Sequence, residues 1–249
     1  MTCPTDPQGN NRDCSKAPRV INNSYAKKGE LMRKAVATWR AAGIIPVFAA
    51  GNFLSDCGTI AHPAYLDNVI AVGATNQDDS LWSGSSKGPS PTGIVKPDLS
   101  APGNDIRSVS TESNSSYRTE FGTSMAAPHV TGTIALMLSA HPEYNYDQVL
   151  AKLRESAATK SLKPSGHECG GTPDTVFPNN QYGSGRLDAA KAVGLPATDD
   201  KADPCALLPP RDCVRDTKCL WDQTKGENGQ CQPHPSSIDD DDSDRPIWS

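Results

Sequence analysis

One stretch, FGTSMAAPHVTG at residues 121–132, constrains the fold more than any other part of this chain. A Gly-Thr-Ser turn leads directly into a run without acidic or basic side chains other than histidine, which ends at His141-Pro142. This pattern predicts a tight loop that enters a helix over about residues 125–140. Pro128 fits in the first turn, where its missing N–H is tolerated. Because the helix is apolar on nearly every face, we expect it in the middle of a domain.

Ser124, at the junction of the loop and the helix, has two interpretations. The first is a helix N-cap, which spacing alone favours. The second is a nucleophile, because the unpaired N–H groups of a helix N-terminus stabilise the negative charge that develops on a carbonyl under attack.

Three apolar segments, residues 18–25, 44–50 and 68–74, read as buried strands, and residues 29–42 have the spacing of a covering helix. A further helix is expected over 146–158, capped by Asn145 and Gln148. The alternation predicts an α/β domain with a mainly parallel sheet, whose functional groups gather where strands end.

The segment GTSMAAPHVTG resembles the nucleophile motif of the subtilisin-like serine peptidases. Four further stretches resemble segments of this family and occur along the chain in the family's order. They are Val20–Ser24, Ala49–Asn52, Lys96–Gly103 and Tyr182–Ala190. The resemblance covers residues 19–194. It implies a partial subtilisin-like three-layer α/β fold that lacks its N-terminal strands.

The resemblance also implies roles for individual residues. Ser124 is the expected nucleophile, and the Asn52 side chain the expected oxyanion donor beside the Ser124 backbone N–H. Asp98 is expected to be structural. The residues expected to bind substrate are Ser24, Tyr25, Ala26, Ala50, Gly51, Gly122 and Thr123. Ala26 stands where the family has glycine, which changes the local contacts to substrate.

The family mechanism also needs an aspartate and a histidine, and neither of their motifs occurs in this chain. The five histidines are His62, His129, His141, His167 and His234. We expect His62 to be an ordinary residue before Pro-Ala and His129 to be a satisfied core histidine.

These observations predict a serine endopeptidase fragment with little activity alone and an open hydrophobic sheet edge. Two alternatives remain. The chain is a non-catalytic peptide-binding or inhibitory relative, or it is one piece of a split peptidase whose partner is an N-terminal fragment carrying Asp and His. A protein or peptide substrate is expected in either peptidase case.

Eight cysteines without a CxxC pair favour disulfides over zinc and indicate an extracellular setting. Met1 is followed by no signal-like segment. We predict the pairs Cys3–Cys14 and Cys57–Cys169. Cys205, Cys213, Cys219 and Cys231 allow three pairings that the sequence leaves open.

The chain divides into a peptidase part (1–196), a linker (197–204), a Cys-rich disulfide-stapled module (205–235) and an acidic, disordered tail (236–249). The module is equally well interpreted as a binding unit or a spacer. The net charge is −5, and the tail alone holds five Asp and one Arg. The near-neutral body and the absence of a long apolar run argue against nucleic acid and membrane partners. No cofactor is required, and structural calcium is an open option.

Two Asn-x-Ser triplets have the sequence of N-glycosylation acceptors, Asn22-Asn23-Ser24 and Asn114-Ser115-Ser116. The first lies in an expected buried strand. The second lies in a polar loop, which makes Asn114 the better candidate.

Overall fold

The computed structural model describes residues 2–27, 30–53, 56–195, 219–222 and 230–233. The chain divides into two compact units, Met1–Leu195 and Pro196–Ser249. The first unit contains the α/β fold. Of the second, the structure describes one antiparallel pair, β9 (Cys219–Asp222) and β10 (Gln230–Pro233). The expected linker and acidic tail, and the disulfides of the Cys-rich segment, lie outside what the structure describes.

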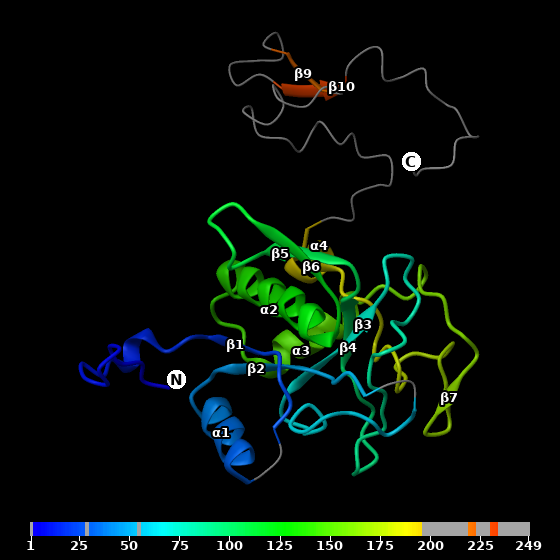
Figure 1. Cartoon of the computed structure of the whole chain (residues 1–249), viewed down its shortest axis with the longest axis horizontal. Helices are drawn as coiled ribbons and strands as arrows, with labels where there is room; N and C mark the ends of the chain where they lie inside the picture. Colours follow the sequence, from blue (N-terminus) through cyan, green and yellow to red (C-terminus); the bar gives the residue numbers. More distant parts are fainter. Residues whose placement is uncertain (1, 28–29, 54–55, 196–218, 223–229, 234–249) are drawn as a thin grey trace. The chain divides into compact units, whose positions relative to one another are not determined.

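The first unit is built on a parallel four-stranded sheet in the order β1-β2-β3-β4 (Figure 1). The strands are β1 (Val20–Asn23), β2 (Ile45–Ala49), β3 (Ile70–Thr75) and β4 (Leu99–Pro102). In this register Asn23 lies opposite Phe48, and Ala49 lies opposite Val72. The segments that follow β1 and β2 therefore emerge at the same edge of the sheet.

Helices cover both faces of this sheet. Helices α2 (Thr123–Ala140) and α3 (Tyr146–Ser156) pack on one face, where Val47, Val72 and Ile134 are fully buried. Helix α1 (Glu30–Ala41) packs on the other, where Val36 meets Phe48. The alternation of side chains along β2 explains why Val47 and Phe48 belong to different core clusters.

Two short elements match the sequence signals. The expected capping box at Asn145 and Gln148 is confirmed, with both reciprocal hydrogen bonds at 3.0 Å. The last helix of this unit, α4 (Ala189–Val193), ends at Gly194 in the left-handed conformation.

The smaller elements are connections on the surface. They are a short 3-10 helix η1 (Cys14–Lys16) and two hairpins, β5 (Ile106–Val109) with β6 (Tyr117–Glu120) and β7 (Glu168–Cys169) with β8 (Thr172–Pro173).

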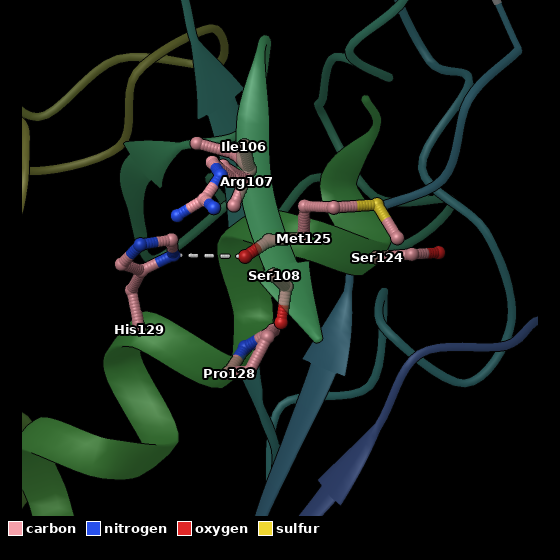
Figure 2. Close-up of a pocket in the computed structure, with 7 residues that line it drawn as sticks. All are labelled: Ile106, Arg107, Ser108, Ser124, Met125, Pro128 and His129. Carbon is pink, nitrogen blue, oxygen red and sulfur yellow. Dashed lines mark hydrogen bonds between the residues drawn. The ribbon is translucent and has the colours of Figure 1, made fainter. Parts of the chain in front are cut away.

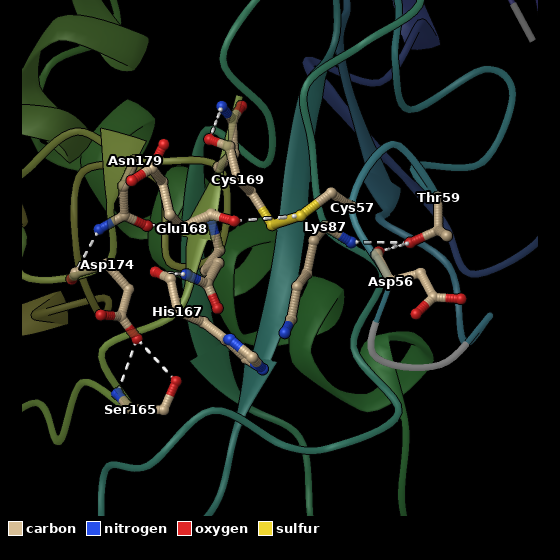
Figure 3. Close-up of a disulfide and its surroundings, with 12 residues drawn as sticks. Asp56, Cys57, Thr59, Lys87, Ser165, His167, Glu168, Cys169, Asp174 and Asn179 are labelled. Carbon is tan, nitrogen blue, oxygen red and sulfur yellow. Dashed lines mark hydrogen bonds between the residues drawn. A yellow bond between two sulfur atoms is a disulfide. The ribbon is translucent and has the colours of Figure 1, made fainter. Parts of the chain in front are cut away.

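Both predicted disulfides of the first unit are confirmed, Cys3–Cys14 and Cys57–Cys169. The second joins the loop after β2 to strand β7, 112 residues further along the chain (Figure 3). It therefore ties the segment that follows Asn52 to the body of the domain.

Asp98 is structural, as expected. Its buried carboxylate accepts hydrogen bonds from the Lys96 ammonium at 2.6 Å, the Arg154 guanidinium at 2.6 Å and the Ala71 backbone N–H at 2.8 Å. Lys96 also donates to the Val69 carbonyl at 2.9 Å. This network joins α3 to the turn before β4.

Helix α2 differs from the expectation of burial on every side. The sheet covers one long face, and the opposite face is exposed, with Leu136 58% accessible. This exposed face consists of Pro128, His129, Gly132, Ala135, Leu136, Ser139 and Ala140. The prediction of a core histidine at residue 129 is therefore wrong, because that position points away from the sheet.

One edge of the sheet is open. Strand β1 pairs with β2, and no other described strand lies on its far side. Helix α2 crosses close to this edge, where the Thr131 hydroxyl donates to the Asn22 side-chain oxygen at 3.1 Å. The exposed face of α2 and the free edge of β1 thus border each other.

Candidate active site

Ser124 lies inside the first turn of α2 and does not cap the helix. The N-cap is Gly122, whose φ of 131° suits a residue without a side chain, and it provides no side-chain cap. The Ser124 hydroxyl instead donates to the Ser24 carbonyl at 3.3 Å. The N-cap interpretation of Ser124 is therefore wrong.

A second bond joins the same two residues in the opposite direction. Because Pro128 has no N–H, the Ser124 carbonyl four residues earlier lacks its usual helical donor. The Ser24 hydroxyl donates to that carbonyl at 2.8 Å. The proline thus opens an acceptor that links the end of β1 to the start of α2.

Asn52 follows β2 and reaches the same helix terminus. Its side-chain oxygen accepts hydrogen bonds from the Thr123 backbone N–H at 3.0 Å and from the Thr123 hydroxyl at 2.8 Å. The Thr123 oxygen in turn accepts from the Gly51 N–H at 3.1 Å. With its oxygen held in this way, Asn52 keeps its NH₂ group available, and within the described residues that group donates no hydrogen bond.

Gly122 gives the Asn52 amide its space. A methyl group at residue 122 would lie 2.8 Å from the Asn52 nitrogen. The positive φ and this close approach both require glycine at the turn before Ser124. Gly122, an expected substrate-binding residue, thus also allows the turn to pack closely against Asn52.

A cavity of about 240 Å³ brings most of the expected residues together. Seven of its lining residues were expected from the sequence: Ser24, Tyr25, Ala26, Gly51, Asn52, Thr123 and Ser124. Thr123 is buried, and its hydroxyl is used between Asn52 and Gly51. The Tyr25 hydroxyl donates to the Asn23 side chain at 2.9 Å, and partial burial raises the pKa of Tyr25.

Ala50 does not line this cavity, which corrects the prediction. It is fully buried in the core on the α1 side, whereas Ala49 and Phe53 line the cavity. Successive side chains of a strand point to opposite faces, so Ala49 and Ala50 cannot both face the cleft. That alternation is the signal that would have selected Ala49.

A second cavity, of about 350 Å³, lies on the other side of Ser124. Figure 2 shows Ile106, Arg107 and Ser108 of β5 facing Met125 and His129 of α2 across it. The His129 Nδ1 lies 2.8 Å from the Met125 carbonyl oxygen. Since a carbonyl oxygen can only accept, the Nδ1 is the donor of this hydrogen bond. The cavity borders the exposed face of α2.

No described histidine bonds to the Ser124 hydroxyl. His62 is buried against Tyr65 and bonds through Nδ1 to the Lys27 carbonyl. His141 lies 3.5 Å from Glu143. His234 lies outside the described residues. Within the part of the chain that the structure describes, the site therefore holds a hydroxyl and an amide donor, and no imidazole is hydrogen-bonded to that hydroxyl.

The site thus places a serine at a helix N-terminus beside a held carboxamide, at the carboxyl edge of a parallel sheet, and both groups can stabilise negative charge on an oxygen. The Subtilase family model (Peptidase S8) matches residues 7–186. The chain therefore belongs to the Subtilase family.

Three bacterial relatives support this membership. Bacillopeptidase F of Bacillus subtilis (strain 168) is 38% identical over 204 residues, which cover 78% of this chain and 13% of that protein. Serine protease AprX of the same strain is 34% identical over 70% of this chain and 40% of its own length. Subtilisin Savinase of Lederbergia lenta is 34% identical, with coverages of 65% and 51%. The chain thus spans about half or less of these relatives.

Three general properties accompany the site. The two disulfides indicate an oxidising compartment. Among the described residues, no helix has both the length and the apolar character needed to cross a membrane. The same residues contain no group of three or more His, Cys, Asp or Glu side chains arranged to hold a metal ion.

Proposed function

We propose that this chain carries the nucleophile and oxyanion site of a subtilisin-type serine endopeptidase. The substrates would be proteins or peptides in the extracellular space, and hydrolysis would pass through an acyl-enzyme on Ser124. The observation that carries this proposal is the meeting of Ser124 and Asn52 in one cavity, with the Asn52 oxygen engaged by Thr123.

In the proposed reaction the substrate carbonyl lies between the Ser124 hydroxyl and the Asn52 NH₂ group. Attack by the Ser124 oxygen places negative charge on the carbonyl oxygen. The Asn52 N–H and the Ser124 backbone N–H donate to that oxygen, and the helix N-terminus favours the charge.

The neighbouring residues would hold the substrate. The segment that follows β1, Ser24 to Ala26, is proposed to pair with the substrate backbone, as the family resemblance implies. The side chain before the scissile bond would enter the cavity of about 240 Å³, where Ala49 and Gly51 leave room. Gly122 and Thr123 complete its wall by fixing Asn52.

The proton acceptor would come from outside residues 1–249. We propose a partner fragment that carries the Asp and His of the mechanism, so that Ser124 loses its proton to that histidine. Without it, hydrolysis should be very slow. In subtilisin itself, loss of the histidine costs on the order of 10⁶ in kcat, a family value carried over to this chain.

The surface described above supports such a partner. Strand β1 offers free backbone groups along one edge, and α2 beside it exposes Leu136 and Ala135. The cavity between β5 and α2 reaches from this exposed face to Ser124. A partner seated on β1 and α2 could therefore deliver an imidazole to the nucleophile.

Two measurements on the full chain test the proposal. A fluorophosphonate reagent should label Ser124 slowly in the chain alone and much faster after addition of an N-terminal subtilase fragment bearing Asp and His. Peptide hydrolysis should appear only in the mixture. Ser124→Ala should abolish both signals, and Ser161→Ala, at an exposed serine in the loop after α3, should leave both unchanged.

A second candidate is a non-catalytic peptide-binding or inhibitory protein. It is favoured by the bond that the Ser124 hydroxyl already makes with the Ser24 carbonyl. In this case, a substrate-like peptide would bind to the chain and to Ser124→Ala with equal affinity, and no fluorophosphonate labelling would occur with or without the fragment.

A further inference from the structure

The chain carries two Asn-x-Ser triplets, and the structure gives their asparagines different environments. Asn22 lies in β1, two residues before Ser24 of the candidate site. Asn114 lies in the turn that joins β5 and β6 (Figure 1). The proposed peptidase activity makes no use of Asn114, so its role is a separate question.

The position of Asn114 is suited to the attachment of a bulky modification. It is exposed, together with residues 111–113 and Ser115, at the tip of the hairpin. Within the described residues its side chain takes part in no hydrogen bond. The turn is closed by other groups: the Ser110 N–H donates to the Ser116 carbonyl at 2.9 Å, and the Ser113 N–H donates to the Ser116 hydroxyl oxygen at 2.9 Å. A substituent on the Asn114 nitrogen therefore breaks no contact of the fold.

Asn22 is exposed, which corrects the expectation of a buried position, but both sides of its amide are occupied. Its NH₂ donates to the Ser24 hydroxyl at 3.0 Å, and its oxygen accepts from the Thr131 hydroxyl at 3.1 Å. Ser24 is in turn bonded to the Ser124 carbonyl. A glycan on Asn22 would stand on the open edge of the sheet, next to the nucleophile. The folded structure thus tolerates a glycan at Asn114 and disfavours one at Asn22.

We propose that Asn114 is an N-glycosylation site and that Asn22 is left unmodified. The donor class is a lipid-linked oligosaccharide diphosphate. A bond forms between the Asn114 side-chain nitrogen and the anomeric carbon of the sugar, while the bond from that carbon to the diphosphate oxygen breaks. The lipid diphosphate leaves with the electron pair, and the amide nitrogen gives up one proton. The reaction needs no oxidant or reductant.

Two features of the chain agree with this assignment. The disulfides indicate an oxidising compartment, which is where such transfer takes place in secreted proteins. The strands that flank the turn end in Val109 and Tyr117, which pair across the hairpin and are 74% and 53% exposed. A polar glycan at the tip increases the solubility of a hairpin that carries this apolar pair.

The test uses the full chain, given a cleavable secretory leader and translated in the presence of eukaryotic microsomes. We expect a mobility shift of one glycan that an N-glycan-specific amidase removes, with conversion of Asn114 to aspartate located by peptide mass spectrometry. Asn114→Gln and Ser116→Ala should each lose the shift. Asn22→Gln should keep it, and Ser116→Thr, which preserves the acceptor triplet, should keep it too.

The amidase-sensitive shift and the mass-spectrometric location of the aspartate report directly which triplet carries the glycan in each variant. An unmodified wild-type chain, a glycan on Asn22, or a shift that survives Asn114→Gln would each overturn the assignment. None of these readouts depends on peptidase activity, so the result is independent of the proposed function.

Discussion

The side-chain oxygen of Asn52 accepts hydrogen bonds from both the backbone N–H and the hydroxyl of Thr123. These two bonds fix which end of the Asn52 amide faces the cavity. Thr123 is thus a positioning residue: it contributes to the candidate oxyanion site by holding Asn52.

Replacing Thr123 by valine should slow acylation of Ser124, because one of the two bonds that hold Asn52 is lost. A bond of about 0.5–1.5 kcal/mol corresponds to a rate loss of roughly two- to twelvefold. Asn52→Leu should cost more, about 10²–10³, a value known for subtilisin itself. The measurement is the rate at which a fluorophosphonate labels Ser124 in the mixture of the full chain with the N-terminal subtilase fragment. Thr123→Ser, which keeps the hydroxyl, is the control, and equal rates for Val and Ser would contradict the role of that bond.

The bond between Ser24 and the Ser124 carbonyl should depend on Pro128. Ser24→Ala leaves that carbonyl without a donor, at a cost of about 1–3 kcal/mol in the free energy of unfolding. In a Pro128→Ala background the new N–H of residue 128 can donate to the same carbonyl, so the cost of Ser24→Ala should shrink. Urea unfolding of the four proteins gives the coupling energy. Equal costs in both backgrounds would show that Pro128 does not create the open acceptor.

The Asp98 network should be important for stability. Lys96→Met leaves a buried carboxylate without its closest cation and the Val69 carbonyl without its donor, so unfolding should become easier by about 3–5 kcal/mol. Arg154→Leu should cost less, about 1.5 kcal/mol, because the Arg154 side chain is 47% exposed and Lys96 remains. Denaturant unfolding measures both, and the reverse order would contradict the geometry.

Stability should fall at alkaline pH through Tyr182. Burial raises the pKa of this residue from 10.0 to about 12, and its hydroxyl donates to the Lys163 carbonyl at 3.0 Å. Between these values the unfolded chain releases the proton and the folded chain keeps it, so the free energy of unfolding decreases as the pH rises through this window.

Thermal unfolding at several pH values measures this dependence. Tyr182→Phe should reduce the dependence of stability on pH between pH 10 and about 12, and it should also lower the overall stability. Burial also raises the pKa of Tyr146, so part of the slope should remain. Tyr117→Phe, at an exposed position of the hairpin, controls for loss of a phenol. Identical slopes for wild type and Tyr182→Phe would exclude the assignment.

The two disulfides should contribute unequally. Cys57–Cys169 closes a loop of 112 residues within the folded core, and its removal should cost about 4–5 kcal/mol by loop entropy. Cys3–Cys14 spans 11 residues, so by the same loop entropy its replacement by two alanines should cost less, about 2.5–3 kcal/mol. Calorimetry of the two double variants checks this order.

The sequence was a good guide to elements with strong local signals. Three of the four sheet strands, the capping box at Asn145 and both disulfides of the first unit were predicted, whereas β4 was not. Ser124 and Asn52 were expected to meet, and they line one cavity. These features follow from periodicity, turn chemistry and the family resemblance.

The errors arose where a third element decides the environment. Whether Ala49 or Ala50 faces the cleft depends on which side of β2 receives α2, and an unbroken apolar run does not encode that choice. The apolar sequence of α2 predicts a core position for His129, yet the sheet and α4 leave the face of α2 that carries His129 exposed. The link from Pro128 through the Ser124 carbonyl to Ser24 joins residues 100 apart in sequence.

Strand β1 is only four residues long, so its open edge can form few main-chain hydrogen bonds with an added strand. If the proposed partner docks here, its selectivity rests on side-chain fit along α2, where the exposed Leu136 lies beside Gly132, Ala135 and Ser139. Such an edge discriminates by shape, and chains that merely adopt an extended conformation gain little by docking on it.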